Sequence, residues 1–252
     1  MKRSQFSIIN DKYYIHNETI HNSKAPKEVV PLIMELIQPT SILDVGCGIG
    51  TWLQAFDQFG IKDYMGIDGS YVDRNLLKIS GEHFTPQDLR NPWNLNRKFD
   101  LVISLEVAEH LEAEYAEHFV NSLVNHGDVV VFSAAIPGQS GQNHINEQWL
   151  SYWQEKFAQV GYILYDAIRP RIWTNERVDV WYKQNLVIFC KENHPLNQKL
   201  NKTSSGYINV VHPDMYSFYR YQAERAQLYE AGKLGLKSAF DALLKALFNK
   251  LR

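Results

Sequence analysis

The stretch Leu43-Asp44-Val45-Gly46-Cys47-Gly48-Ile49-Gly50-Thr51-Trp52 decides the fold of this 252-residue chain. An apolar run enters three glycines at alternate positions, and a helical pattern begins at Thr51. Glycine has no Cβ and reaches positive φ angles without strain, so the backbone of such a turn can lie close to a ligand. The pattern predicts a strand, a ligand-binding turn and a helix at the carboxyl edge of a largely parallel sheet.

Strand-like and helix-like segments alternate on both sides of this turn. The strand-like segments are apolar along most of their length, which is typical of a doubly wound α/β sheet covered by helices on both faces. We expect strands within 41–45, 64–68, 83–89, 99–107, 128–136, 162–168 and 186–192, and helices over 26–38, 51–60, 108–125 and 146–161, the last with Asn146 as its N-cap.

Composition divides the chain into three parts. Residues 1–25 form a polar, aromatic N-terminal arm that could close over a ligand as a lid, 26–192 an α/β domain, and 193–252 a linker followed by an amphipathic helical extension. In that extension Phe240, Leu243, Leu244, Leu247 and Leu251 share one face, and basic residues outnumber acids. Such a helix suits a peripheral membrane contact, a second copy of the chain or packing on its own domain.

The charge balance and the cysteine content limit the partners and the compartment. Lys and Arg total 26 against 28 Asp and Glu, giving a net charge of −2, so we expect no duplex nucleic acid partner. Two cysteines cannot form a disulfide framework, and no segment has the length and hydropathy of a membrane span. We therefore expect a cytoplasmic protein, peripheral to a membrane at most.

The glycine turn resembles the first motif of the class I S-adenosylmethionine-dependent methyltransferases. Its spacing is Gly-x-Gly-x-Gly, not the Gly-x-Gly-x-x-Gly of dinucleotide-binding turns. The resemblance implies a Rossmann-like sheet of seven strands, mostly parallel with the last strand antiparallel, and a C-terminal helical tail. It also implies that Asp44 and the glycines hold the methionine end, Asp68 the ribose, and Asp88 with Leu89 the adenine. The implied cofactor contacts are Asp44, Gly46, Cys47, Gly48, Gly50, Thr51, Trp52, Asp68, Gly69, Asp88, Leu89 and Leu105.

A second group of polar residues follows the strands expected at 99–107 and 128–136. Glu106, Glu109 and His110 are spaced i, i+3 and i+4, so one helical turn would present them on one face. His144 lies in the loop after the next strand, at the same sheet edge. Two carboxylates and two imidazoles can bind Mg, Mn, Fe or Zn. The sequence thus offers Glu106, Glu109, His110 and His144 as metal ligands, with Glu109, His110 and His144 as catalytic residues.

The Glu-x-x-Glu-His motif is similar to one in metal-dependent 2′-O-methyltransferases of small-RNA ends, and also to one in ubiquinone-pathway O-methyltransferases. Two alternatives stay open: His144 as a general base without a metal, and purely structural roles for these residues. The chain is interpreted as an S-adenosylmethionine-dependent O-methyltransferase for a carbohydrate or another polar hydroxylated acceptor, a small molecule or a glycan. The rivals are an RNA-end 2′-O-methyltransferase, a metal-free small-molecule O-methyltransferase and a non-catalytic adenosylmethionine-binding subunit.

Overall fold

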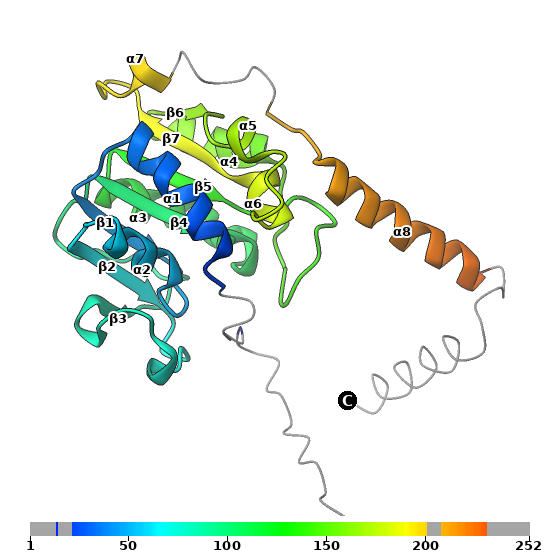
Figure 1. The fold of residues 1–252 in the computed structure, drawn as a ribbon, viewed down its shortest axis with the longest axis horizontal. Helices are drawn as coiled ribbons and strands as arrows, with labels where there is room; N and C mark the ends of the chain where they lie inside the picture. Colours follow the sequence, from blue (N-terminus) through cyan, green and yellow to red (C-terminus); the bar gives the residue numbers. More distant parts are fainter. Residues whose placement is uncertain (1–13, 15–21, 201–207, 231–252) are drawn as a thin grey trace, which may run out of the picture. The chain divides into compact units, whose positions relative to one another are not determined.

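A seven-stranded sheet with the order β3-β2-β1-β4-β5-β7-β6 forms the centre of the fold (Figure 1). The computed structural model describes residue 14 and residues 22–200 and 208–230. Six strands are parallel, and β7 runs antiparallel to both of its neighbours. This confirms the doubly wound, Rossmann-like sheet with one reversed strand. The strands are β1 (Ser41–Val45), β2 (Asp63–Asp68), β3 (Phe84–Pro86), β4 (Leu101–Leu105), β5 (Val129–Ser133), β6 (Tyr162–Tyr165) and β7 (Val187–Lys191).

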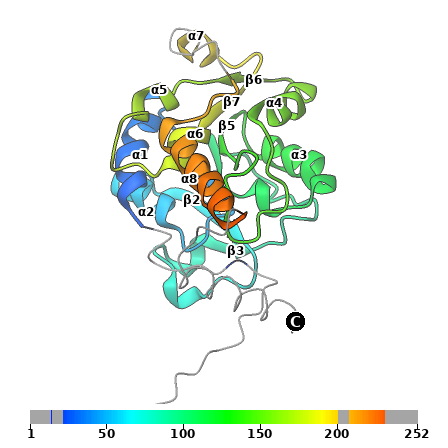
Figure 2. The same cartoon turned by 90° about the vertical axis from the view of Figure 1, so that its right-hand side faces the viewer.

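Helices cover both faces of the sheet, as Figure 2 shows. One face packs against α1 (Lys24–Leu36), α2 (Thr51–Gln58), α5 (Arg169–Ile172) and α6 (Val180–Asn185), and the other against α3 (Ala116–His126) and α4 (Leu150–Gln159). Side chains alternate between two apolar clusters along the strands, so that Leu101 and Ile103 face the first helix layer and Val102 faces the second. Burial on both faces explains why the strands are apolar throughout.

The segment after β4 does not form the continuous helix expected over 108–125. It contains two short 3₁₀ turns, η3 (Ala108–His110) and η4 (Ala113–Tyr115), before α3 begins. The carbonyl of Glu109 accepts hydrogen bonds from the amides of Ile145 and Asn146, at 2.9 and 3.0 Å. The Glu109 carbonyl is therefore bonded to a distant loop and not to an amide of the next helical turn. Further 3₁₀ turns are η1 (Arg74–Leu76) and η2 (Gly81–His83).

The expected N-cap at Asn146 is also wrong, because α4 begins at Leu150 with Trp149 as its cap. The Asn146 amide is bonded to the Glu109 carbonyl, and the Gln148 amide donates to the carbonyl of Ala135 at 3.1 Å. These two bonds hold residues 146–148 against the sheet edge, so the helix begins only at Leu150.

The chain divides into two units, Met1–Val210 and Val211–Arg252. The short helix α7 (Asn197–Leu200) belongs to the first unit, and α8 (Pro213–Glu230) to the second. The apolar face expected between Phe240 and Leu251 lies outside the described residues, as does most of the expected 1–25 arm. Among the helices that the structure describes, none is both long and apolar enough to cross a membrane.

Candidate active site

The turn between β1 and α2 has the backbone conformation that its glycines predict. The φ angles of Gly46, Gly48 and Gly50 are 78°, 53° and 81°, in the left-handed region that favours glycine. A Cβ on Gly46 would lie 2.3 Å from Cγ2 of Val107, and one on Gly50 would lie 2.8 Å from Cγ1 of Ile79. The turn therefore needs glycine both for its φ angles and for its close packing.

Asp68 ends β2, and its carboxylate links the turn after β1 to the residue that follows β2. Asp68 is 3% exposed, and its carboxylate accepts hydrogen bonds from the amides of Gly48, at 2.7 Å, and Gly69, at 2.6 Å. Charge-assisted bonds of this kind fix a carboxylate in one orientation. The structure thus places Asp68 directly beside the glycine turn.

Asp44, near the end of β1, is equally buried and lacks a complete set of hydrogen bonds. Among the described residues nothing donates to its Oδ2 atom. Burial, together with the nearby Asp68 carboxylate, raises the pKa of Asp44 well above its usual value. A buried carboxylate oxygen without a donor suits a cationic ligand, and the ammonium group of adenosylmethionine is one. The residues present therefore fit the methionine end of that cofactor.

Most of the other residues expected to contact the cofactor lie at the same edge. Trp52, in the first turn of α2, donates from Nε1 to the Tyr182 hydroxyl at 3.4 Å. Leu89 follows β3, and Leu105 ends β4. Cys47, Thr51, Trp52, Leu89 and Leu105 are all buried.

Asp88 lies at the surface and is engaged by Arg90. The guanidinium donates from Nε to Oδ1 at 2.9 Å and from Nη2 to Oδ2 at 2.8 Å. These bonds hold the pKa of Asp88 below its usual value. The Asp88 carboxylate, which the resemblance assigns to adenine, is therefore bonded to Arg90. The role of Asp88 in binding adenine stays a prediction.

Three of the four expected metal ligands converge on the acceptor side of the site. One ligand atom each from Glu109, His110 and His144 lies within 4.8 Å of the others. Glu109 is fully buried, and neither of its carboxylate oxygens makes a well-formed hydrogen bond among the described residues, although the Ala135 amide and the Glu106 carboxyl lie close to them. Burial, with the charge of Glu106, raises the pKa of Glu109 well above its usual value. One carboxylate and two imidazoles therefore fit a divalent cation, whose charge would compensate the buried acid.

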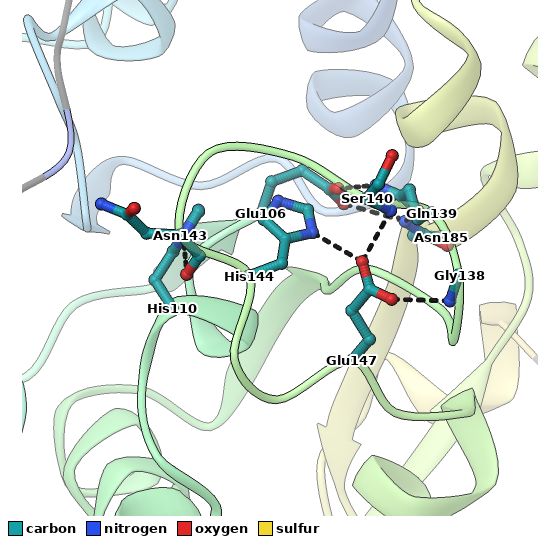
Figure 3. A network of polar contacts seen from close by, with 9 residues as sticks. All are labelled: Glu106, His110, Gly138, Gln139, Ser140, Asn143, His144, Glu147 and Asn185. Carbon is teal, nitrogen blue, oxygen red and sulfur yellow. Dashed lines mark hydrogen bonds and ion pairs between the residues drawn. The ribbon is translucent and has the colours of Figure 1, made fainter. Parts of the chain in front are cut away.

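Glu106 lies outside this three-residue group and has its own partners. It has a φ of 56°, and its carboxylate accepts bonds from Gln139 Nε2 at 2.7 Å and from Asn185 Nδ2 at 3.1 Å (Figure 3). The left-handed backbone turns Glu106 away from the direction that a helical turn would give it. Its role as a fourth metal ligand stays a prediction.

Sequence reasoning missed the residues that hold the acceptor side together. Glu147 accepts from Nδ1 of His144 at 2.9 Å, and Gln139 and Asn185 bind Glu106. The spacing of three residues between His144 and Glu147 was a local signal for the first pair. Asn185 precedes β7, far along the chain, and carried no such signal.

Tyr14 is the part of the expected N-terminal arm that the structure places at the site. Its ring packs edge-on against His110, with the centroids 5.0 Å apart. Burial and the charges of Glu109, Glu106 and Asp68 raise the pKa of the Tyr14 phenol. Tyr14 therefore lies near both the acceptor cluster and the cofactor side.

Comparison with known proteins agrees with this arrangement. The family model described as "Methyltransferase domain" matches residues 19–183, which is more than half of the chain. The chain therefore belongs to this methyltransferase family. It contains an S-adenosylmethionine-dependent methyltransferase domain.

Individual relatives are more distant. The mitochondrial ubiquinone biosynthesis O-methyltransferase of Dictyostelium discoideum is 25% identical over 159 residues, a match that covers 56% of this chain and 45% of the relative. This chain thus matches less than half the length of that protein. The sugar N-methyltransferase KedS8 of a Streptoalloteichus species is similar in fold, with a TM-score of 0.57, 15% identity, and coverage of 77% of this chain and 99% of that one. Magnesium protoporphyrin IX methyltransferase of Synechocystis, solved with bound SAH, has a TM-score of 0.50, 16% identity, and coverage of 71% and 90%.

Proposed function

We propose that the chain is an O-methyltransferase that acts on a hydroxyl of a carbohydrate or another polar hydroxylated acceptor, assisted by a divalent metal. The observation that carries this proposal is the buried Glu109 carboxylate, which makes no well-formed hydrogen bond within the described part of the chain and lies within ligand distance of His110 and His144. Such a carboxylate is costly to bury unless a cation or a proton binds it.

The chemistry of a hydroxyl acceptor explains why a methyltransferase would keep such a cluster. The methyl group of adenosylmethionine is already activated by its sulfonium, so the enzyme chiefly aligns the incoming nucleophile. An aliphatic hydroxyl, in contrast, holds its proton tightly at neutral pH and needs a base or a metal. A divalent ion bound here would lower the pKa of a coordinated hydroxyl.

The residues of the chain would divide the work as follows. Asp44 binds the ammonium group of the cofactor, and Asp68 the ribose. Glu109, His110 and His144 would hold the ion; in the alternative without a metal, Nε2 of His144 would instead take the acceptor proton. Tyr14 packs edge-on against His110 at one side of the cluster.

The acceptor class rests on exposed apolar side chains of the loop that carries His144. Ile145 and Trp149, in the loop that carries His144, are 58% and 40% exposed. An exposed indole suits the apolar face of a sugar ring. The curated relative is named as an O-methyltransferase, which is compatible with a hydroxyl acceptor, and one structural neighbour is named as a sugar N-methyltransferase, which is compatible with a sugar but transfers to nitrogen. A small-molecule or glycan substrate is therefore proposed, and a cytoplasmic location, where the buried thiols Cys47 and Cys190 remain reduced.

Transfer of a labelled methyl group to a panel of glycans, nucleotides and single-stranded RNA, with and without EDTA, tests the proposal. We expect product with a sugar acceptor, lost in EDTA and restored by Mn²⁺ or Mg²⁺. Undiminished product in EDTA would overturn the metal role. Methylation confined to RNA ends, with strong salt dependence, would favour the RNA-end alternative.

A further inference from the structure

The loop between β5 and α4 is organised around the carboxylate of Glu147. Its Oε2 accepts a hydrogen bond from the Gly138 amide at 2.6 Å, and its Oε1 accepts from the Ser140 amide at 2.7 Å. Oε1 also contacts Nδ1 of His144 at 2.9 Å, as Figure 3 shows. The side chains of His144 and Glu147 are only 12% and 18% exposed. One shielded carboxylate therefore joins the start of the loop to the histidine near its end.

This contact has a chemical consequence for the imidazole of His144. An ionised carboxylate only accepts hydrogen bonds, so the nitrogen that faces it must carry the proton. The neutral ring then has its proton on Nδ1 and its lone pair on Nε2, and the lone pair is what binds a metal or accepts a proton. Free histidine in water favours the opposite tautomer, so the loop holds His144 in the less common one.

The same loop acts on His110 in a similar way. Nδ1 of His110 lies 3.3 Å from the carbonyl oxygen of Asn143, which is also only an acceptor. Two further amides of the loop bind the Glu109 carbonyl, which fixes the loop to η3. The loop thus contacts all three residues of the candidate metal cluster through groups that are not ligands themselves.

We propose that Glu147 is a positioning residue that fixes His144 in the Nδ1–H tautomer and presents its Nε2 to the cluster of Glu109 and His110. The consequence for metal affinity rests on the proposed function, whereas the tautomer itself does not. Partners of this kind behind metal-binding histidines typically contribute 10–100-fold to metal affinity or activity.

Nitrogen NMR of the 252-residue chain reads the tautomer directly. The protein, labelled with ¹⁵N at histidine and saturated with adenosylmethionine but free of metal, is observed at a pH where its imidazoles are neutral. The signals of His144 are assigned as those missing from His144→Ala. We expect Nδ1–H in the wild type and Nε2–H in Glu147→Ala. Glu147→Met, which fills the volume without a carboxylate, is the second variant and gives the same result if Ala impairs folding.

Two controls separate the carboxylate from a general loosening of the loop. Gln139→Ala removes the bond between the loop and Glu106 but keeps Glu147, so His144 should stay in the Nδ1–H form. Glu155→Ala removes an exposed glutamate of α4 and should change nothing. Adenosylmethionine affinity, measured by calorimetry, should stay within about twofold in Glu147→Ala, because Glu147 makes no contact with the glycine turn.

The outcomes distinguish this inference from the proposed function. A wild-type ring in the Nε2–H form, or an unchanged tautomer in both Glu147 variants, overturns the role of Glu147 even if the enzyme binds Mn²⁺ and methylates sugars. The expected tautomers in a protein that fails to bind Mn²⁺ uphold the role of Glu147 and overturn the metal. Where Mn²⁺ does bind, its affinity should fall about 10–100-fold in Glu147→Ala.

Discussion

Backbone groups form most of the cofactor side of the site, whereas side chains form the acceptor side. On the cofactor side, the turn after β1 relies on backbone geometry, with positive φ angles at three glycines and the Gly48 amide bonded to Asp68. On the acceptor side, side chains from η3 and a distant loop converge, and other side chains hold them in place. The cofactor side is therefore local in sequence and the acceptor side is not. Separate substitutions should be able to disable one side while the other still works.

The largest expected effect is on the acceptor side. Glu109→Gln keeps the size of the side chain but removes the charge, and we expect kcat to fall about 100–1,000-fold, as when one electrostatic group of an active site is lost. Calorimetric affinity for adenosylmethionine should not change, because Glu109 does not contact the glycine turn. The exposed Glu112→Gln is the matched control. Equal losses of cofactor affinity and kcat would contradict the separation of the two sides.

Asp44→Asn tests the cofactor side and should act in two opposite directions. Loss of a charge-assisted bond to the ammonium group should weaken adenosylmethionine binding about 10–100-fold. The free energy of unfolding of the ligand-free protein should instead rise at neutral pH, since the native fold no longer buries an unsatisfied carboxylate.

The pH dependence of this stability follows from the raised pKa of Asp44. The native state binds the proton more tightly than the unfolded chain, so this group favours folding in acid. That contribution is lost as the pH rises from the unfolded pKa through the higher native one. The gap in melting temperature between Asp44→Asn and the wild type should therefore widen with pH over this window. A constant gap would exclude the burial of a charged Asp44.

Gly46→Ala should affect both the cofactor side and the acceptor side, through the contact of residue 46 with Val107. The new methyl group would lie 2.3 Å from Cγ2 of Val107, the residue that follows Glu106, and the φ of 78° would be strained for alanine. We expect a loss of about 1–3 kcal/mol in unfolding free energy from overpacking. Adding Val107→Ala should restore part of it by removing the clash but not the strain. Gly81→Ala, where nothing lies within 4 Å, is the control, and an equal loss there would rule out this explanation.

The sequence predicted the sheet and the cofactor side because both depend on short-range patterns. Apolar runs predicted the seven strands. The turn from Gly46 to Gly50 forms through the φ angles of its own glycines and through hydrogen bonds to the next strand. The acceptor side was harder because the direction of Glu106 depends on a left-handed φ, and the bends after β4 and before α4 depend on bonds between Glu109 and Ile145, 36 positions apart. Helical spacing therefore could not give the direction of Glu106, whose role as a metal ligand stays a prediction, and the N-cap expected at Asn146 was wrong.

The smallest expected effect concerns Asp88, where the structure and the resemblance to methyltransferases assign the carboxylate to different partners. Arg90→Ala removes the bidentate ion pair, whose two side chains are 48% and 43% exposed, so the cost in stability should stay below about 1 kcal/mol. Because Arg90 lowers the pKa of Asp88, this small contribution exists above the unfolded pKa and disappears as the pH falls through the native one.

If Asp88 reads adenine, freeing it from Arg90 should tighten adenosylmethionine binding by up to about threefold, within the range of an exposed ion pair. Arg97→Ala, which breaks a similarly exposed pair with Asp63 on the opposite edge of the sheet, should leave this affinity unchanged. Titration calorimetry of the two variants decides the matter. Weaker binding in Arg90→Ala would mean that Arg90 itself contributes to the cofactor site and that Asp88 serves to hold the guanidinium in place.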